Sequence, residues 1–138
     1  MKKLHFSVTS EATSGGDTEK HVSAVRGVLS ENDGTIFIHY PENTEGGRIM
    51  TEIQIRGNSV KIRRSGAVIS LMEFAPGKKH DFIYSVPPYR FDASIITREV
   101  LAPGPGERIS LSLDYDLTLG GETRRMLFCI SEKAGEVR

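Results

Sequence analysis

One arginine stands where alternation predicts an apolar side chain. Val60 and Ile62 fall on one face of a predicted strand, and continuing the alternation places Arg64 on that same face. A guanidinium that points into a core is costly unless a carboxylate pairs with it, either from a ligand or from a structural acid. The alternative is that Arg64 ends its strand and its long stem carries the charge into solvent. On the first interpretation, Arg64 is a candidate anchor for an anionic ligand.

Two further charged residues lie on the same face of their predicted strands as apolar neighbours. Arg26 falls on the same side of its predicted strand as Val28, and Glu73 falls on the same side as Leu71. Glu73 is therefore a conceivable internal partner for Arg64, and Arg26 is a second candidate for contact with a ligand.

Two tyrosines also lie on predicted apolar faces. Tyr84 and Tyr115 could supply hydroxyl groups to a cavity inside the protein. The alternative is that both are ordinary core residues whose hydroxyls find a partner nearby. Together with the charged residues above, they complete the candidate ligand-binding set.

A pair of acids has the spacing of a general acid and base. Asp114 and Asp116 are two apart on one predicted strand, which puts the carboxylates about 7 Å apart on one face. The alternation places them opposite Leu113 and Tyr115, on the face that meets water. We therefore interpret them as a solvated pair that also discourages pairing between sheet edges.

Other catalytic and metal-binding patterns are missing from the sequence. There is no G-x-S-x-G segment, and the lone Cys129 has no neighbour that would obviously activate it. The four histidines are scattered over separate predicted strands, without the spacing of a metal site: His5, His21, His39 and His80. We expect no metal and no cofactor, and no catalytic residue is assigned. An enzyme would need two of His39, His80, Asp114 and Glu73 to converge in a cleft at a barrel mouth.

The composition narrows the partners and the compartment. Lysine plus arginine equals aspartate plus glutamate at 18 each, so no overall field favours nucleic acid. A single cysteine excludes an intrachain disulfide. No apolar stretch follows the two N-terminal lysines, so we expect neither a signal peptide nor a membrane span, and a cytosolic location.

The elements that must position these residues are strands. From Ile109 to Leu119 apolar and polar residues alternate without a fault, and Gly120 and Gly121 then make a tight hairpin. Similar segments recur along the chain between turn residues. Residues 90–101 could be a short helix, but their β-branched side chains favour a strand. A one-sided strand of this length is typical of an antiparallel sheet.

These elements predict an all-β protein, a single domain over residues 1–138, with frayed ends at 1–3 and 132–138. A long meander exposes two edges unless it closes, so we expect a single antiparallel up-and-down barrel of about 8–10 strands. A two-sheet sandwich is the alternative. A barrel of this size has room for packed side chains or for one small ligand.

Three segments are similar to those of a known family. They are T-E-I-Q-I from Thr51, V-K-I-R-R-S-G-A-V from Val60 and G-E-R-I-S-L-S-L-D-Y-D-L from Gly106. On these motifs the chain resembles the bacterial YwiB-like proteins, and the resemblance spans residues 27–130. It implies a lipocalin-like (calycin) closed barrel. The family is one of unknown function, so the resemblance implies no chemistry.

Three functions remain open from the sequence. The first is a non-catalytic barrel that binds a small apolar or amphipathic anion, anchored by Arg64. The second is a protein interaction module with a solid core and an exposed apolar patch near residues 86–89, which would also allow a homodimer. The third is an enzyme of the kind described above. Fold analogy alone does not choose among them.

Overall fold

The computed structural model describes residues 1–133 as ten strands, with no helix in that range. The described chain therefore contains no helix that could cross a membrane. The strands are β1 (Lys2–Ser14), β2 (Asp17–Asn32), β3 (Thr35–Thr44), β4 (Gly47–Arg56), β5 (Ser59–Gly66), β6 (Ser70–Phe74), β7 (Lys79–Val86), β8 (Tyr89–Leu101), β9 (Ser110–Leu119) and β10 (Glu122–Glu132). The all-β prediction is confirmed, and residues 90–101 belong to a strand.

All ten strands form one antiparallel sheet in the order β6-β5-β4-β3-β2-β1-β10-β9-β8-β7. Neighbours in the sheet are neighbours in the chain, except where β1 pairs with β10 and joins the two ends of the chain. The remaining edges, β6 and β7, meet through a single bridge between Ile69 and Ser85. The result is an up-and-down barrel that is nearly closed, as the meander predicted.

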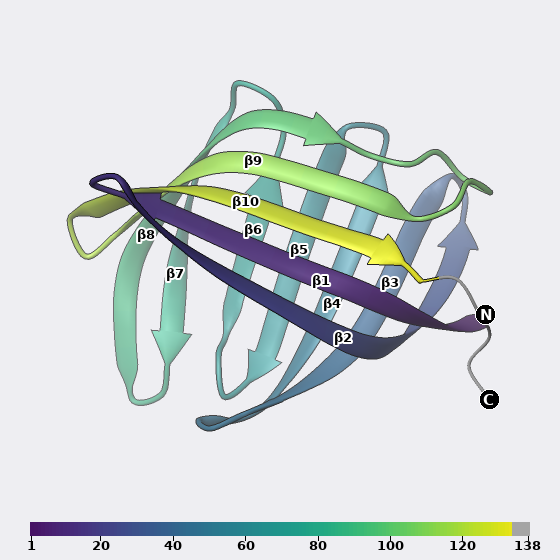
Figure 1. The fold of residues 1–138 in the computed structure, drawn as a ribbon, viewed down its shortest axis with the longest axis horizontal. Helices are drawn as coiled ribbons and strands as arrows, with labels where there is room; N and C mark the ends of the chain where they lie inside the picture. Colours follow the sequence, from purple (N-terminus) through teal and green to yellow (C-terminus); the bar gives the residue numbers. More distant parts are fainter. Residues whose placement is uncertain (134–138) are drawn as a thin grey trace.

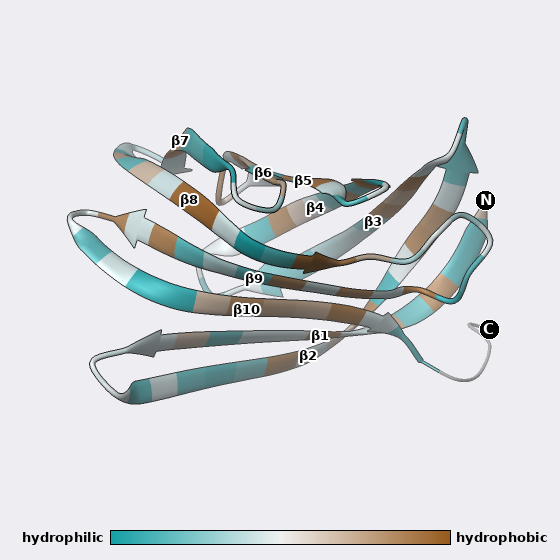
Figure 2. Cartoon of the chain, turned by 90° about the horizontal axis from the view of Figure 1, so that it is seen from above, coloured by the Kyte–Doolittle hydropathy of each residue, from teal (hydrophilic) through white to brown (hydrophobic). Residues whose placement is uncertain are grey.

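The barrel is flattened, with two walls facing each other. Figure 1 shows the long strands β1, β2, β9 and β10 crossing in front of β3 to β6. Seen from above in Figure 2, the two groups lie on opposite sides, and apolar and polar residues alternate along the strands. The inward side chains interlock in one core that includes Phe6, Ile36, Ile38, Ile53, Ile55, Ile62, Ile95, Ile109, Leu111 and Leu113.

Strand β2 has a neighbouring strand on both sides over only part of its length. Residues 17–29 of β2 pair with β1, but only residues 28–32 pair with β3. Gly27 lies where this second partner begins, and a Cβ there would sit 2.8 Å from the His39 carbonyl oxygen and 2.9 Å from the Phe6 ring. Glycine lets the backbones approach closely at this point. The first part of β2 is left as a free edge.

The N-terminus differs from the expectation of a frayed end. Strand β1 begins at Lys2, which pairs with Leu29, so the N-terminal residues are part of the sheet. Strand β10 runs to Glu132. The expectation for the last residues falls on 134–138, which lie outside the described part of the chain.

Candidate functional site

A row of polar side chains crosses four strands on the inner face of the barrel. Tyr40 on β3 pairs with Thr51 on β4, Thr51 with Arg64 on β5, and Arg64 with Ser70 on β6. Tyr40, Thr51 and Ser70 are buried, and Arg64 is half-buried. The other inward positions on these strands are mostly apolar. This row is therefore a place inside the barrel where polar side chains from four strands lie side by side.

Arg64 points inward, as the alternation predicted, and its strand ends two residues later. Val60 and Ile62 precede it on the same face and are buried. Gly66 adopts a φ of 103°, and a Cβ at this position would collide with the Arg48 carbonyl oxygen. Only glycine fits there without strain, so the residue fixes how β5 ends and where Arg64 lies against β4.

The Arg64 guanidinium has no salt bridge and no hydrogen bond to any residue in the range 1–133. Its charge acts instead on two phenols, Tyr40 and Tyr115, whose pKa values it lowers. Burial has the larger effect and raises the pKa of both tyrosines, so both hydroxyls stay neutral at physiological pH. The site therefore combines a fixed positive charge with hydroxyl groups that can donate hydrogen bonds.

A partly enclosed cavity of about 200 Å³ lies beside Arg64. Its polar lining consists of Arg64, Tyr84, Tyr115 and Ser10. The remaining walls are apolar: Met72, Phe82, Ala93, Leu117, Leu119, Met126 and Phe128. Three of the five residues predicted from the sequence thus meet at one cavity, with the Tyr115 ring held edge-on against Phe74 at 4.8 Å between centroids.

Sequence reasoning missed the hydroxyl groups that accompany Arg64. The Ser70 Oγ atom is buried and has no hydrogen-bond partner within the described chain, although Ser70 is the strand partner of Arg64. The Thr51 hydroxyl donates to Glu42 Oε1 at 3.2 Å, at the end of the same polar row. The signal was available, because each of these polar residues occupies an inward position in an otherwise apolar alternation.

The inward placement predicted for Arg26 is wrong. Arg26 is exposed on the outer face, and the inward residues of β2 are Val25, Gly27 and Leu29. The prediction took the side of Val28 as the apolar face, but Val28 is only half-buried and Val22, on that same side, is 62% exposed. This part of β2 has a free edge and no opposite wall, so an apolar side chain there does not mark the core.

The inward placement predicted for Glu73 is also wrong. Ser70, Met72 and Phe74 are the buried residues of β6, and Glu73 points outward. Its carboxylate lies 3.7 Å from Lys61 Nζ. The prediction failed because β6 carries apolar residues on both faces, so alternation could not decide which face is inside.

Two residues that an enzyme would need do converge, at the junction of β6 and β7. His80 Nδ1 lies 3.4 Å from Glu73 Oε2, and His80 Nε2 lies 3.1 Å from the Leu71 carbonyl oxygen. Because a carbonyl only accepts, Nε2 must carry hydrogen and donate it. This hydrogen bond joins β7 to β6, while Nδ1 faces the Glu73 carboxylate. Asp114, another member of that set, is bound by Arg125 at 2.9 Å on the outer face.

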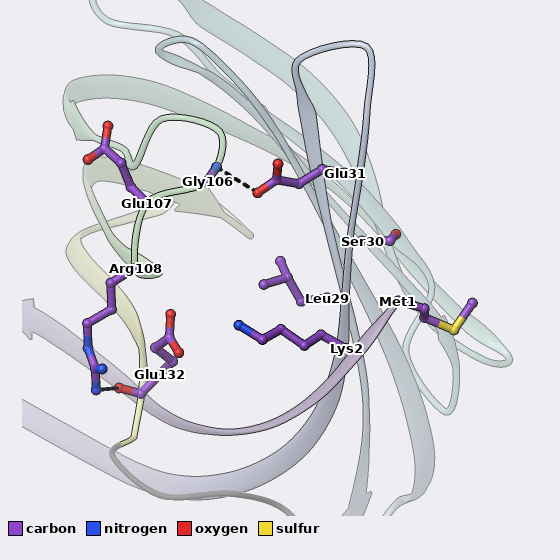
Figure 3. Close-up of a pocket in the computed structure, with 9 residues that line it drawn as sticks. All are labelled: Met1, Lys2, Leu29, Ser30, Glu31, Gly106, Glu107, Arg108 and Glu132. Carbon is purple, nitrogen blue, oxygen red and sulfur yellow. Dashed lines mark hydrogen bonds between the residues drawn. The ribbon is translucent and has the colours of Figure 1, made fainter.

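A second pocket lies at the other end of β1 and β9, and Figure 3 shows Lys2 pointing into it. Its acids hold the loop that leads into β9. Glu31 accepts a hydrogen bond from the Gly106 amide at 2.8 Å, and Glu132 accepts one from the Ile109 amide at 2.8 Å. We interpret this pocket as structural, since its carboxylates already bind backbone donors.

The apolar patch expected near residues 86–89 is partly present. Val86 is 37% exposed and Tyr89 is 66% exposed, on the turn between β7 and β8. The role of this turn in contacting a partner stays a prediction.

These observations define a class of protein: over residues 1–133 it is a ten-stranded up-and-down barrel, with an arginine that has no salt bridge in that range beside an interior cavity. Residues 6–127 match the model of DUF1934, a domain of unknown function, and the chain belongs to this family.

The fold is similar to a solved structure, the crystal structure of ywiB protein from Bacillus subtilis. The TM-score is 0.84 at 19% sequence identity, and the match covers 96% of this chain and 93% of that one. No curated protein matches the sequence. The comparisons establish family and fold, so any chemistry must be argued from the site.

Proposed function

We propose that this barrel is a cytosolic, non-catalytic protein that binds a small amphipathic anion in the cavity beside Arg64. One observation carries the proposal: a half-buried guanidinium faces the interior without a salt bridge in the described chain. A carboxylate would bind this group through two parallel hydrogen bonds.

The surroundings of Arg64 fit the two halves of such a ligand. Tyr84, Tyr115 and Ser10 line the same cavity and supply hydroxyl donors for the anionic end. The apolar walls, from Met72 to Phe128, suit a short hydrocarbon body. Pockets that combine an apolar lining with a few convergent polar groups are typical of small-molecule sites.

Neighbouring arginines on opposite faces of β5 provide a matched test. Arg64→Met removes the inward charge and keeps a side chain of similar length, and Arg63→Met removes an exposed charge from the outer face. Isothermal titration with hexanoate should show binding to the wild type. The Arg64 variant should lose at least about tenfold in affinity, because a hydrogen bond to a charged group contributes about 1.5–3 kcal/mol. The Arg63 variant should retain the wild-type affinity.

Several outcomes would overturn the proposal. Equal losses in both variants, or a larger loss in Arg63→Met, would place the anion on the outer face. Absence of hexanoate binding, together with no co-purifying small molecule in native mass spectra of protein from its source, would show that the interior takes no such ligand. The Arg64 variant should fold, since removing a half-buried charge that has no salt bridge within residues 1–133 does not destabilise a core.

A further inference from the structure

The edges of the barrel at β6 and β7 are held together at two points with a gap between them. The first point is the bridge in which the amides of Ile69 and Ser85 each donate to the other's carbonyl, at 2.8 and 2.9 Å. The second is the bond from His80 to the Leu71 carbonyl. Between these points the described strands form no ladder pairs. We call this gap the seam.

A groove of about 510 Å³ lies along the seam. Its apolar lining includes Ile69, Leu71, Phe82 and Ile83. Ile69 is 49% exposed and Ile83 is 40% exposed, although both are large and apolar. Adjacent apolar side chains on an outer face are unusual in a strand that already buries its other face, and they mark a binding surface.

The groove and the interior cavity share two lining residues. Arg64 and Phe82 line both spaces, so their side chains lie between inside and outside. The cavity alone, at about 200 Å³, is smaller than sites for drug-sized ligands, which are about 300–1,000 Å³. The groove falls within that range, and two arginines line it. Arg63 is exposed on the outer face, whereas Arg64 points inward and also lines the cavity. An amphipathic ligand could therefore place its anionic group inside the barrel, at Arg64, and most of its hydrocarbon chain outside, in the groove.

We infer that the ligand is a straight-chain carboxylate of medium length, whose carboxylate binds Arg64 inside and whose chain leaves through the seam and lies in the groove. The inference rests on the proposed function and adds the ligand class and its path. Phe82 would contact the chain where it passes between β6 and β7. Ile69 and Ile83 would cover its outer part.

A chain-length series tests the path. Titration with hexanoate, octanoate, decanoate and dodecanoate, each below its micelle concentration, should show affinity rising with length. Full burial of a methylene raises affinity about fourfold, so half-burial in an open groove should give about twofold per methylene. If the ligand were confined to the cavity, the affinity would instead level off or fall beyond the shortest chains.

Variants of the groove give the second arm. The double variant Ile69→Gln, Ile83→Gln should weaken decanoate by about tenfold and leave hexanoate unchanged, because only the longer chain reaches the groove. Ile96→Gln is the matched control, since Ile96 is 48% exposed on β8 and does not line the groove. Its affinity for both ligands should equal that of the wild type.

Failure of the proposed function and failure of the path through the seam would give different results. If hexanoate does not bind, the proposed function itself is wrong. If hexanoate and decanoate bind with equal affinity and the groove variants change neither, the interior site stands and the seam path is wrong. A loss for decanoate in the Ile96 variant as large as in the double variant would also overturn the path, because it would show nonspecific surface binding.

Discussion

The barrel has to close its sheet at two places, and it does so in opposite ways. At the chain ends, β1 and β10 share a continuous ladder from Phe6 opposite Glu132 to Thr13 opposite Arg125. At the seam, β6 and β7 share one bridge and one histidine side chain. The side chains differ accordingly: Phe6, Phe128 and Ile130 face inward at the sealed junction.

The half-buried Arg64 explains why the seam stays open, because its side chain lines both the groove and the cavity there. Sealing β6 against β7 would bury this charge more deeply, at a large desolvation cost. Leaving the seam open keeps the guanidinium close to solvent or to a ligand. The contrast shows that closure of a barrel depends on the inward side chains as much as on the available backbone groups.

Truncating the sealed junction should have the largest effect on stability. Phe6 is fully buried, and Phe6→Ala should lower the free energy of unfolding by about 3–5 kcal/mol, through lost transfer free energy and a new cavity. Phe82→Ala at the half-buried seam should cost about 1–2 kcal/mol, because part of that side chain is already exposed and the site is already hollow. Urea unfolding followed by fluorescence or circular dichroism measures both. Equal losses would show that the seam is packed as tightly as the sealed junction.

The next largest effect should come from Gly66, which fixes the end of β5 near the seam. Gly66→Ala should cost about 1–3 kcal/mol, since alanine is strained at this φ and its Cβ would push the Arg48 carbonyl away. Gly57→Ala is the control, because Gly57 also has a positive φ of 61° but nothing lies within 4 Å of a Cβ there. Gly66→Ala should lose more stability than Gly57→Ala in the same urea titration. Equal losses would show that neither the φ of 103° nor the contact with the Arg48 carbonyl adds to the cost.

At the seam, the alternation of apolar and polar residues in the sequence did not predict which face of the strand is inside. Alternation predicted β9 and the inward Arg64, because each of those segments carries apolar residues on one face only. The same rule failed at β6, where Ile69 and Leu71 on the outer face compete with Met72 on the inner one. Those outer apolar residues line the groove, so the pattern that misled the prediction belongs to the candidate site.

The convergence of the site residues could not be predicted from local pattern. That Tyr84, Tyr115 and Arg64 surround one cavity depends on how β5, β7 and β9 curve toward one another across the barrel. Likewise, nothing in the sequence shows that β6 and β7 remain unpaired, because both have the length and composition of ordinary strands. Pairing between distant segments is a property of the closed sheet.

Removing the hydrogen bond from His80 should destabilise the seam and leave the rest of the barrel unchanged. His80→Phe keeps the stacking on Phe82, whose ring lies 5.9 Å away and nearly parallel, but removes the bond to Leu71. Loss of this hydrogen bond should cost about 1 kcal/mol and speed amide hydrogen exchange in β6 and β7. Exchange in β1 and β10 should not change.

An outward histidine supplies the control for this experiment. His39→Phe removes only an exposed contact with Glu52 at 3.8 Å, so it should leave exchange at the seam as in the wild type. Uniform acceleration across all strands in His80→Phe would mean that the imidazole supports the whole barrel. Unchanged exchange in β6 and β7 would mean that the Ile69–Ser85 bridge holds the seam by itself.

The smallest effect should come from the outer face of the sealed wall, where Arg125 on β10 binds Asp114 on β9 through two hydrogen bonds of 3.2 and 2.9 Å. The hydrogen bond from Arg125 holds the pKa of Asp114 below its usual range. A lowered pKa in the folded state contributes stability above the pKa of the unfolded chain, which is about 3.9, and this stability is lost as pH falls through the folded value. Asp114→Asn should therefore lower Tm by roughly 2 °C at pH 7, in keeping with the small contribution of solvent-accessible ion pairs. The difference between the variant and the wild type should shrink as pH falls below about 3.9, because the carboxylate then becomes protonated, first in the unfolded and then in the folded state. A difference in Tm that did not change with pH would show that the side chain acts through packing and not through its charge.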